Sequence, residues 1–368
     1  MAVTWCSRWA HRIRNSHKLQ RIVGGLQRIH QVGARFVEFR IRPSVLRFRV
    51  RHVHGPRKIV YGRDELLVLC VVRNGALHVK SFLEHHLTLG ATHVVLLDNG
   101  STDATIDLAR AYDRVTILRT TCPYRIYETI LKRYLVDRFS RDRWNLFVDI
   151  DERFDYPYSN LIDVRRLLTY LNAHGYTAVL AQMLDLFGDG PLDRVRSTPD
   201  DSLRETCPYY DISAVETHDY TFGNPANPAI KMHAGGIRKA VFGTANGLTK
   251  AALIFASSEL VPFVGWHHTD RASIADFSGV LLHYPFLSTF YERVKEAVRS
   301  DRYRVSASGE YRQYWSKLKE TPHLSLKQET ARRFEGVNSL LESGFLVVSE
   351  QYRRWIHGAH RQALRGGS

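Results

Sequence analysis

Short apolar runs and amphipathic helical stripes alternate through the middle of the chain. An unbroken apolar run over 66–72 is followed by apolar side chains at helical spacing from Val79 to Leu87, and Gly90 ends that stripe. We expect strands over 66–72, 93–97, 115–118 and 145–148, and helices that begin at Asn74, at Ser101, Thr102 or Asp103, and near Tyr127. Strands that alternate with helices favour a parallel sheet with right-handed crossovers.

Regular stretches are fewer in the second half of the chain. The pattern there predicts strands over 178–183 and 279–283 and a helix over 290–298. A further helix is expected to open with the capping-box pattern from Ser325 to Gln328 and to end near Gly344. The sequence therefore predicts an α/β fold. Its Rossmann-like, mostly parallel sheet is flanked by helices over 59–300, and a C-terminal helical extension follows over 301–368.

Basic residues are concentrated in an N-terminal segment, residues 1–58. It holds 14 Lys and Arg against the single acid Glu38, although the whole chain has a net charge of only +15. Apolar side chains recur there at helical spacing, beginning with Trp5 and Trp9, which predicts a basic amphipathic helix. From Leu46 the apolar positions alternate with arginines, which predicts a short strand after Pro43.

The basic segment suits peripheral contact with an anionic membrane, because apolar burial and charge attraction add there. A tail that packs on the main domain or stays mobile fits the same pattern. Nucleic-acid binding is disfavoured, since no basic stripe with interleaved aromatic residues continues into the folded body. No run approaches the roughly 20 apolar residues of a membrane span, and no signal peptide is recognisable. The four cysteines lack paired spacing, so we expect a reducing, cytoplasmic setting.

Carboxylates directly follow two of the predicted strands. Asp98 ends the run over 93–97, and Asp149 and Asp151 come directly after the run over 145–148. The carboxyl ends of parallel strands open onto the cleft in which α/β proteins bind ligands. Carboxylate oxygens are hard ligands suited to Mg²⁺ or Mn²⁺, and such an ion could bridge the phosphates of a nucleotide diphosphate.

At this point the sequence resembles a known family. Val72-Arg73-Asn74, the block over 97–105 and the block over 148–152 resemble, in order and spacing, glycosyltransferase family 2 and its family-2-like relatives of the GT-A fold. Later blocks resemble a bacterial branch of that group; they are Gly235 to Arg238 with 241–243, Leu248 to Lys250, and Leu281 to Tyr284. The resemblance covers roughly residues 60 to 300. It departs from the branch at Gly75, where an acid is usual, and at Tyr284-Pro285-Phe286, where a lysine is usual.

The resemblance implies a donor site built on the first blocks. Asp98 would accept hydrogen bonds from the base or ribose, with Asn74 and Asp103 beside it; for these last two a helix cap is an equal alternative. Asp149 would face ribose or metal, and Asp151 would bind the metal. For Glu152 a salt bridge or cap at the sheet edge is as well supported as a role in orienting the site.

The later blocks imply cationic and metal-binding residues. Arg238, after the close-approach glycine Gly236, offers a planar fork suited to phosphate, and Lys250 could act as a point charge. For Arg238 the alternative to a phosphate contact is a surface ion pair. His267 and His268 resemble the histidine that many GT-A enzymes bring to the metal, whereas His283 could be a satisfied core histidine.

The sequence thus predicts a metal-dependent glycosyltransferase that uses Mn²⁺ or Mg²⁺ and a nucleotide-diphosphate sugar. The acceptor would be a glycan or a lipid-linked molecule, in surface polysaccharide or glycan synthesis. Resemblance to family 2 implies inversion, with one carboxylate as general base. Asp185 is our first choice for that base, and four other acids stay open: Asp189, Glu205, Asp211 and Glu216.

Two other functions fit the same residues. A nucleotide-binding protein that keeps the fold without catalysis would act as a partner in polysaccharide synthesis. A metal-dependent phosphohydrolase would use Asp149 or Asp151 as nucleophile, but the Asp98 block would then lack an evident purpose.

Overall fold

The structure is a computed structural model of the whole chain, and it describes residues 41–257, 261–263, 267–300 and 305–366. The chain separates into two compact units, Met1–Val50 and Arg51–Ser368. The expected domain boundaries at residues 58 and 300 stay predictions. The amphipathic helix expected over the first 30 residues lies outside the described residues.

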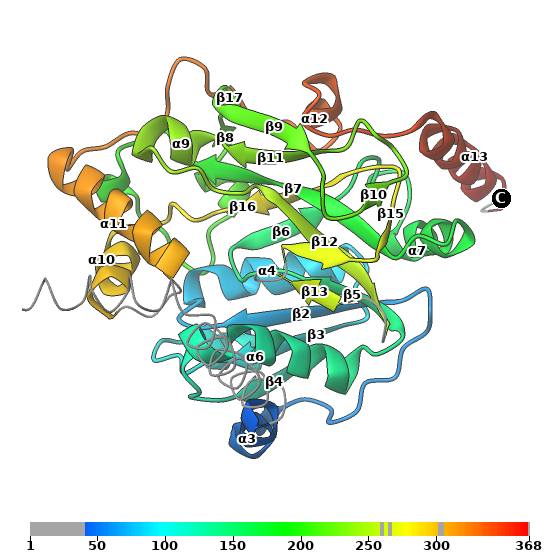
Figure 1. Cartoon of the computed structure of the whole chain (residues 1–368), viewed down its shortest axis with the longest axis horizontal. Helices are drawn as coiled ribbons and strands as arrows, with labels where there is room; N and C mark the ends of the chain where they lie inside the picture. The colour runs from blue at the N-terminus through cyan, green and yellow to red at the C-terminus, as the bar shows by residue number, and fades with distance from the viewer. Residues whose placement is uncertain (1–40, 258–260, 264–266, 301–304, 367–368) are drawn as a thin grey trace, which may run out of the picture. The chain divides into compact units, whose positions relative to one another are not determined.

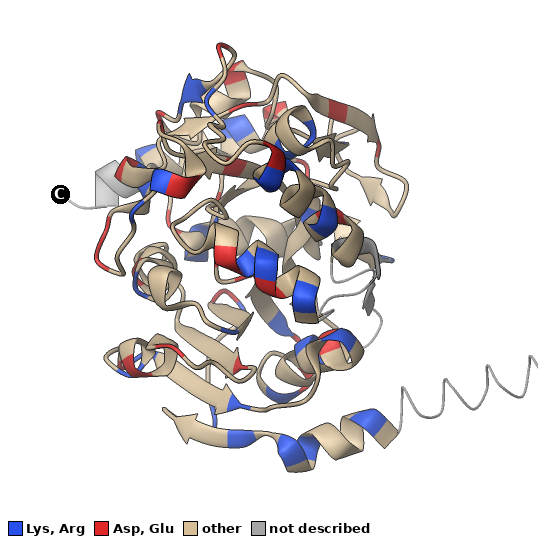
Figure 2. Ribbon diagram, turned by 90° about the vertical axis from the view of Figure 1, so that its left-hand side faces the viewer, with Lys and Arg blue, Asp and Glu red and all other residues tan. Residues whose placement is uncertain are grey.

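The described part of the first unit is the helix α3 (Arg42–Arg49). The strand predicted from Leu46 onward is therefore wrong over 46–49, and a strand, β1 (Arg51–His54), begins only in the second unit. Pro43 explains the difference, because proline near a helix start has the right φ and needs no hydrogen-bond partner for its nitrogen. The charged residues of α3 are all basic, whereas basic and acidic residues are interspersed along the second unit (Figure 2).

The first half of the second unit confirms the predicted alternation of strands and helices. Parallel strands lie side by side in the order β4-β3-β2-β5, and helices connect them in turn (Figure 1). The strands are β2 (Leu66–Val72), β3 (His93–Asp98), β4 (Val115–Arg119) and β5 (Arg143–Phe147), and the helices are α4 (Ala76–Thr88), α5 (Thr105–Ala109) and α6 (Tyr124–Phe139). β1 pairs antiparallel with β4 at the edge. Apolar residues of β2 and β3 are buried on both faces, as parallel strands covered by helices require.

The second half of the sheet corrects the prediction of a mostly parallel sheet. β12 (Thr249–Ala256) lies antiparallel between β5 and β7 (Ala178–Phe187). β16 (Gly279–His283) runs parallel to β7 and antiparallel to β6 (Glu152–Asp155). The large central sheet flanked by helices is therefore mixed. Alternation of apolar runs reveals strands but not their direction, which depends on connections too irregular to predict.

Shorter elements surround this sheet. Further strands are β8 (Tyr209–Tyr210), β9 (Val215–Asp219), β10 (Asn224–Pro225), β11 (Lys231–Gly235), β13 (Val261–Phe263), β14 (His268–Asp270), β15 (Ser273–Ile274) and β17 (Arg332–Arg333). Further helices are α7 (Val164–Ala173), the 3₁₀ turn η2 (Leu192–Arg194), α8 (Leu203–Thr206), α9 (Ile237–Phe242), α10 (Phe290–Ser300), α11 (Val305–Glu320), α12 (Ser339–Glu342) and α13 (Glu350–Gly366). None of the helices in the described ranges is long and apolar enough to cross a membrane.

The helix predicted from Ser325 to Gly344 is wrong. Gln328 reaches only the Ser325 carbonyl (3.4 Å), and the chain then runs into β17, which pairs with β8. Leu324 and Leu326 pack with buried aromatic residues of α9, α10 and α11. These leucines therefore belong to an extended segment that packs on the core, and not to a helix. Only the short α12 forms within the predicted range.

Phe154 of β6 supports the part of the sheet that carries the acids described below. Its side chain is fully buried, and a Cβ on Gly279 would come within 2.8 Å of its ring. We expect Phe154→Ala to lower the free energy of unfolding by about 3–5 kcal/mol, because it leaves a cavity. Urea denaturation measures this. The control variant Val60→Ala, at an exposed position, should change the free energy of unfolding by less than about 0.5 kcal/mol. Equal losses in both variants would show that Phe154 does not support the sheet.

Candidate active site

The predicted donor-site residues lie where the strand order of the sheet reverses. β2 is paired with β3 on one side and β5 on the other, and all three strands are parallel. Asn74, Asp98 and Asp149 lie at or just after the carboxyl ends of these strands. In open α/β sheets such a reversal opens the crevice in which ligands bind. The fold therefore brings these predicted residues together at the carboxyl ends of neighbouring parallel strands.

The turn between β5 and β6 carries Asp149 and Asp151. We call residues 148–152 the acid turn. The Glu152 N–H donates to the Asp149 carbonyl (3.0 Å), and the Asp149 N–H donates to Glu152 Oε2 (2.8 Å). The buried Arg153 donates to the Ile150 carbonyl (2.9 Å). These bonds fix the backbone that supports Asp149 and Asp151.

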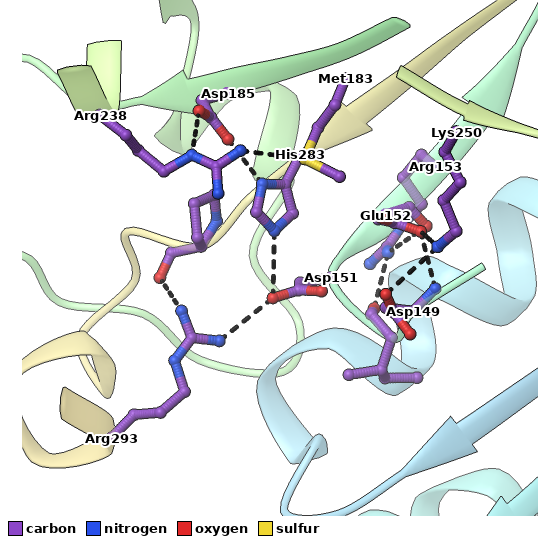
Figure 3. A network of polar contacts seen from close by, with 12 residues as sticks. Asp149, Asp151, Glu152, Arg153, Met183, Asp185, Arg238, Lys250, His283 and Arg293 are labelled. Atoms are coloured by element: carbon purple, nitrogen blue, oxygen red, sulfur yellow. Dashed lines mark hydrogen bonds and ion pairs between the residues drawn. The ribbon is translucent and has the colours of Figure 1, made fainter. Parts of the chain in front are cut away.

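Lys250 of β12 neutralises one side of the acid turn (Figure 3). Its side chain is 0% exposed, and its Nζ donates to Glu152 Oε2 (2.6 Å) and Asp149 Oδ2 (3.2 Å). Burial acts to lower the pKa of Lys250, but the two carboxylates outweigh it and raise the pKa. Burial acts to raise the pKa of Asp149, whereas Lys250 and Lys132 lower it. Lys250 is thus an ion-pair partner, and its contact with a phosphate stays a prediction.

His283 joins the other side of the acid turn to Asp185. Its Nδ1 donates to Asp185 Oδ1 (2.6 Å), and its Nε2 lies 3.4 Å from Asp151 Oδ2. Burial acts to lower the pKa of His283, but Asp151 and Asp185 outweigh it and raise the pKa to about 9. His283 is therefore an imidazolium held between two carboxylates, and not a neutral core histidine.

Arg238 and Asp185 form a buried ion pair behind His283. Arg238 Nε donates to Asp185 Oδ2 (2.7 Å), and Glu310 of α11 lies 3.6 Å from the same guanidinium. Both oxygens of Asp185 are thus engaged, and its pKa is lowered, since Arg238 and His283 outweigh the effect of burial. These contacts favour a positioning role for Asp185, because a base must release such partners to accept a proton. Its role as general base stays a prediction.

Arg293 of α10 supplies a third cation to the acid turn. Its NH1 donates to Asp151 Oδ2 (3.1 Å) and its NH2 to the Pro285 carbonyl (2.7 Å). Arg293 and His283 outweigh burial, so the pKa of Asp151 lies well below its usual value. The sequence did not reveal Arg293, because nothing in a helical stripe indicates which turn faces a site. His283 lay within a block that resembles the family, but its place after an apolar strand suggested a core histidine.

The remaining predicted donor residues fasten two loops together. Asp98 is buried and accepts from the N–H groups of Gly100 (3.2 Å) and Ser101 (3.0 Å). Asn74, at φ 53°, accepts from the Thr102 N–H (2.9 Å), and Asp103 accepts from the N–H of Ala76 (3.0 Å), the first residue of α4. Asp103 also accepts from the N–H of Thr105 (3.1 Å), the first residue of α5, so its contacts match the capping alternative. Asn74 does not cap α4, whose N-cap is Gly75. A ligand contact of any of the three stays a prediction.

One of the two predicted histidine ligands, His267, lies near Asp149. His267 is near enough for Asp149 to influence its pKa, which burial lowers to about 3, and His268 stacks on the ring of Phe222 (centroids 3.9 Å apart). The described ranges contain no cluster of three or more His, Cys, Asp or Glu that could hold a metal. The histidine that the structure places beside Asp151 is His283.

The donor atoms of the acid turn nevertheless fit a divalent cation. Within the described part of the chain, one carboxylate oxygen of Asp149 and one of Asp151 accept no hydrogen bond, since all the contacts above use Oδ2. Mg²⁺ commonly takes one or two carboxylates and completes its shell with water and substrate phosphates. Two available oxygens are therefore enough, and a closed protein cage is not needed.

The four other candidate bases differ in their surroundings. Asp189 pairs with Lys327 (2.7 Å), Glu216 pairs with Lys239, and Asp211 accepts from Ser213 (2.8 Å). Glu205 is exposed on α8. None of these contacts reaches the acid turn.

Comparison with known proteins gives little. No family model matches the chain, and no curated protein matches it. Among solved structures, one match is glucosyl-3-phosphoglycerate synthase from Mycobacterium tuberculosis, solved with Mn²⁺, uridine-diphosphate-glucose and phosphoglyceric acid. The TM-score is 0.25 at 19% identity, and the match covers 38% of this chain and 54% of that one. The chain thus spans about half the length of that enzyme, and so slight a likeness decides neither fold nor function.

Lys250→Met should destabilise the protein, because Glu152 would remain buried without its cation. We expect a loss of about 3–5 kcal/mol in the free energy of unfolding, measured by urea denaturation. The double variant Lys250→Met/Glu152→Gln should recover most of the loss, since it leaves no fully buried charge unpaired. A double variant as unstable as the single one would show that the pair is not the cause.

The raised pKa of His283 makes stability depend on pH. Its folded-state pKa is about 9 against the usual 6.5, so the stabilisation is complete below pH 6.5 and is lost as pH rises through 9. In metal-free protein, the free energy of unfolding is measured at several pH values between 6.5 and about 9. It should fall more steeply with rising pH for the wild type than for His283→Gln. Parallel curves would disprove the assignment. An NMR titration of the imidazole gives the pKa directly.

Proposed function

We propose that this protein is a glycosyltransferase that moves a sugar from a nucleotide-diphosphate donor to an acceptor hydroxyl. The observation that carries the proposal is the placement of Asp149 and Asp151 just after β5, beside the strand-order reversal. Each has one carboxylate oxygen that accepts no hydrogen bond from the described residues. A nucleotide fits the crevice between β2 and β5 because ligands of such sheets bind outside the carboxyl ends at the reversal.

Asp149 and Asp151 are the residues proposed to hold Mn²⁺ or Mg²⁺. When bound, the ion would supply positive charge to the diphosphate leaving group. The chain's own residues prepare this position. Lys250 and Glu152 hold Asp149, while His283 and Arg293 hold Asp151, so both carboxylates are oriented before a ligand arrives. Fixed charges of this kind need no rearrangement during the reaction, which is how preorganised sites lower barriers.

Inversion, the bacterial family-2 assignment and a role in surface polysaccharide synthesis belong to the same proposal and rest on the sequence resemblance. So do a glycan or lipid-linked acceptor and a cytoplasmic location, with residues 1–58 touching the inner face of the membrane. Deleting residues 1–50, which leaves β1 in place, should remove association with anionic vesicles while leaving turnover with a free acceptor unchanged.

Calorimetric titration tests the donor site. We expect UDP or GDP to bind the wild type in the presence of Mn²⁺, and Asp151→Asn to weaken that binding by about tenfold or more, because a metal ligand is lost. Asp107→Asn is the matched control, since Asp107 is an exposed acid of α5 that pairs with Arg110 on the same helix turn. Equal affinity in all three proteins would contradict the proposed site.

Two further outcomes separate the alternatives. Nucleotide binding without sugar transfer or donor hydrolysis across a sugar panel would favour a non-catalytic binding protein. A phosphorylated aspartate detected by mass spectrometry at Asp149 or Asp151 would favour a phosphohydrolase. Turnover of one nucleotide sugar that requires both Asp151 and metal would support the glycosyltransferase.

A further inference from the structure

We propose that Arg293 occupies the cation position of Asp151 in the ligand-free protein, competes there with the divalent ion, and serves as a ligand of the donor diphosphate. This inference rests on the proposed function and adds a residue to the same site. It concerns the binding of metal and donor, and not the bond-making step.

Cations of the chain already face the carboxylates of the acid turn. Lys250 pairs with Asp149 and Glu152, and Arg293 pairs with Asp151, beside which His283 also lies. A divalent ion arriving alone would add two positive charges beside these cations, and like charges at short range repel strongly in a partly buried site. A metal with a diphosphate brings compensating negative charge. The balance therefore favours joint binding of the two.

Arg293 is the cation best placed to give way. Lys250 is fully buried between two carboxylates, and His283 is 12% exposed and anchored at both ring nitrogens. The Arg293 side chain is 29% exposed and contacts Asp151 through NH1 and the Pro285 carbonyl through NH2. Its stem is long and flexible, and its planar fork matches phosphate oxygens as well as carboxylates. If Arg293 leaves, Asp151 still lies beside His283, so no fully buried charge is left alone.

The argument predicts two opposite effects of one substitution. Arg293→Gln should strengthen the binding of Mn²⁺ alone by about tenfold, because Asp151 loses its competing charge-assisted bond. The same variant should weaken the binding of UDP or GDP in saturating Mn²⁺ by about tenfold, because the diphosphate loses a charged donor. A residue that merely supported the fold would weaken both.

Titrations on the full chain measure both quantities. Mn²⁺ binding without nucleotide is followed by electron paramagnetic resonance, and nucleotide binding by calorimetry. Arg299→Gln is the matched control, because Arg299 lies on the same helix, is exposed, and loses the same charge. Arg293→Lys keeps the charge at Asp151, so its affinity for Mn²⁺ alone should stay within about threefold of the wild type. This second variant tests the competition even if Arg293→Gln does not fold.

The outcomes separate this inference from the proposed function. Opposite shifts in Arg293→Gln, with Arg299→Gln like the wild type, support it. Wild-type binding of Mn²⁺ and nucleotide that needs Asp151 but is unchanged in Arg293→Gln overturns the competition and leaves the donor site standing. A gain in Mn²⁺ affinity for Arg293→Lys as large as that expected for Arg293→Gln overturns it too. Failure of the wild type to bind either ligand overturns both.

Discussion

Charge pairing on the acid turn is the constraint around which the second unit is arranged. Four carboxylates lie close together, and without partners they could not all stay ionised in a buried place. Their cations come from four elements that follow the acid turn much later in the sequence: Lys250 from β12, Arg238 from α9, His283 from β16 and Arg293 from α10. The later elements must therefore dock on the early parallel strands before the turn is stable. This requirement links the site to the whole unit.

The pairing of β6 with β16 shows how the sheet serves the turn. Glu152 lies opposite His283 and Arg153 opposite Leu282 in the register, so side chains alternate between the two faces. Glu152 and His283 face the acids, while Arg153 and Leu282 line a cavity of about 1180 Å³ that contains none of the four carboxylates. Arg153 nevertheless holds the Ile150 carbonyl from that side. The turn is thus supported by backbone bonds on one face and ion pairs on the other.

Local patterns predicted the first half of the fold and much less of the second. The strands and helices from β2 to β5 follow from apolar runs bounded by turns, because each can be recognised within about ten residues. The direction of β12 and the extended segment after Ser325 depend on distant partners and could not be predicted that way. The acids of the site were visible, since they end apolar runs. Lys250 and Arg238 were visible as candidate phosphate contacts, but His283 and Arg293 acquire their meaning only from tertiary contacts with Asp151.

Stability alone explains this arrangement poorly. Removing charges from water is costly, and apolar residues of similar volume often stabilise a core as well as buried ion pairs do. A purely structural cluster would also have no reason to leave one oxygen of Asp149 and one of Asp151 without a hydrogen bond within the described residues. Strongly shifted pKa values beside a strand-order reversal are typical of sites that bind or transform ligands. The paired cations keep the acids ionised and oriented, and the two open oxygens are where a ligand with positive charge would complete the set.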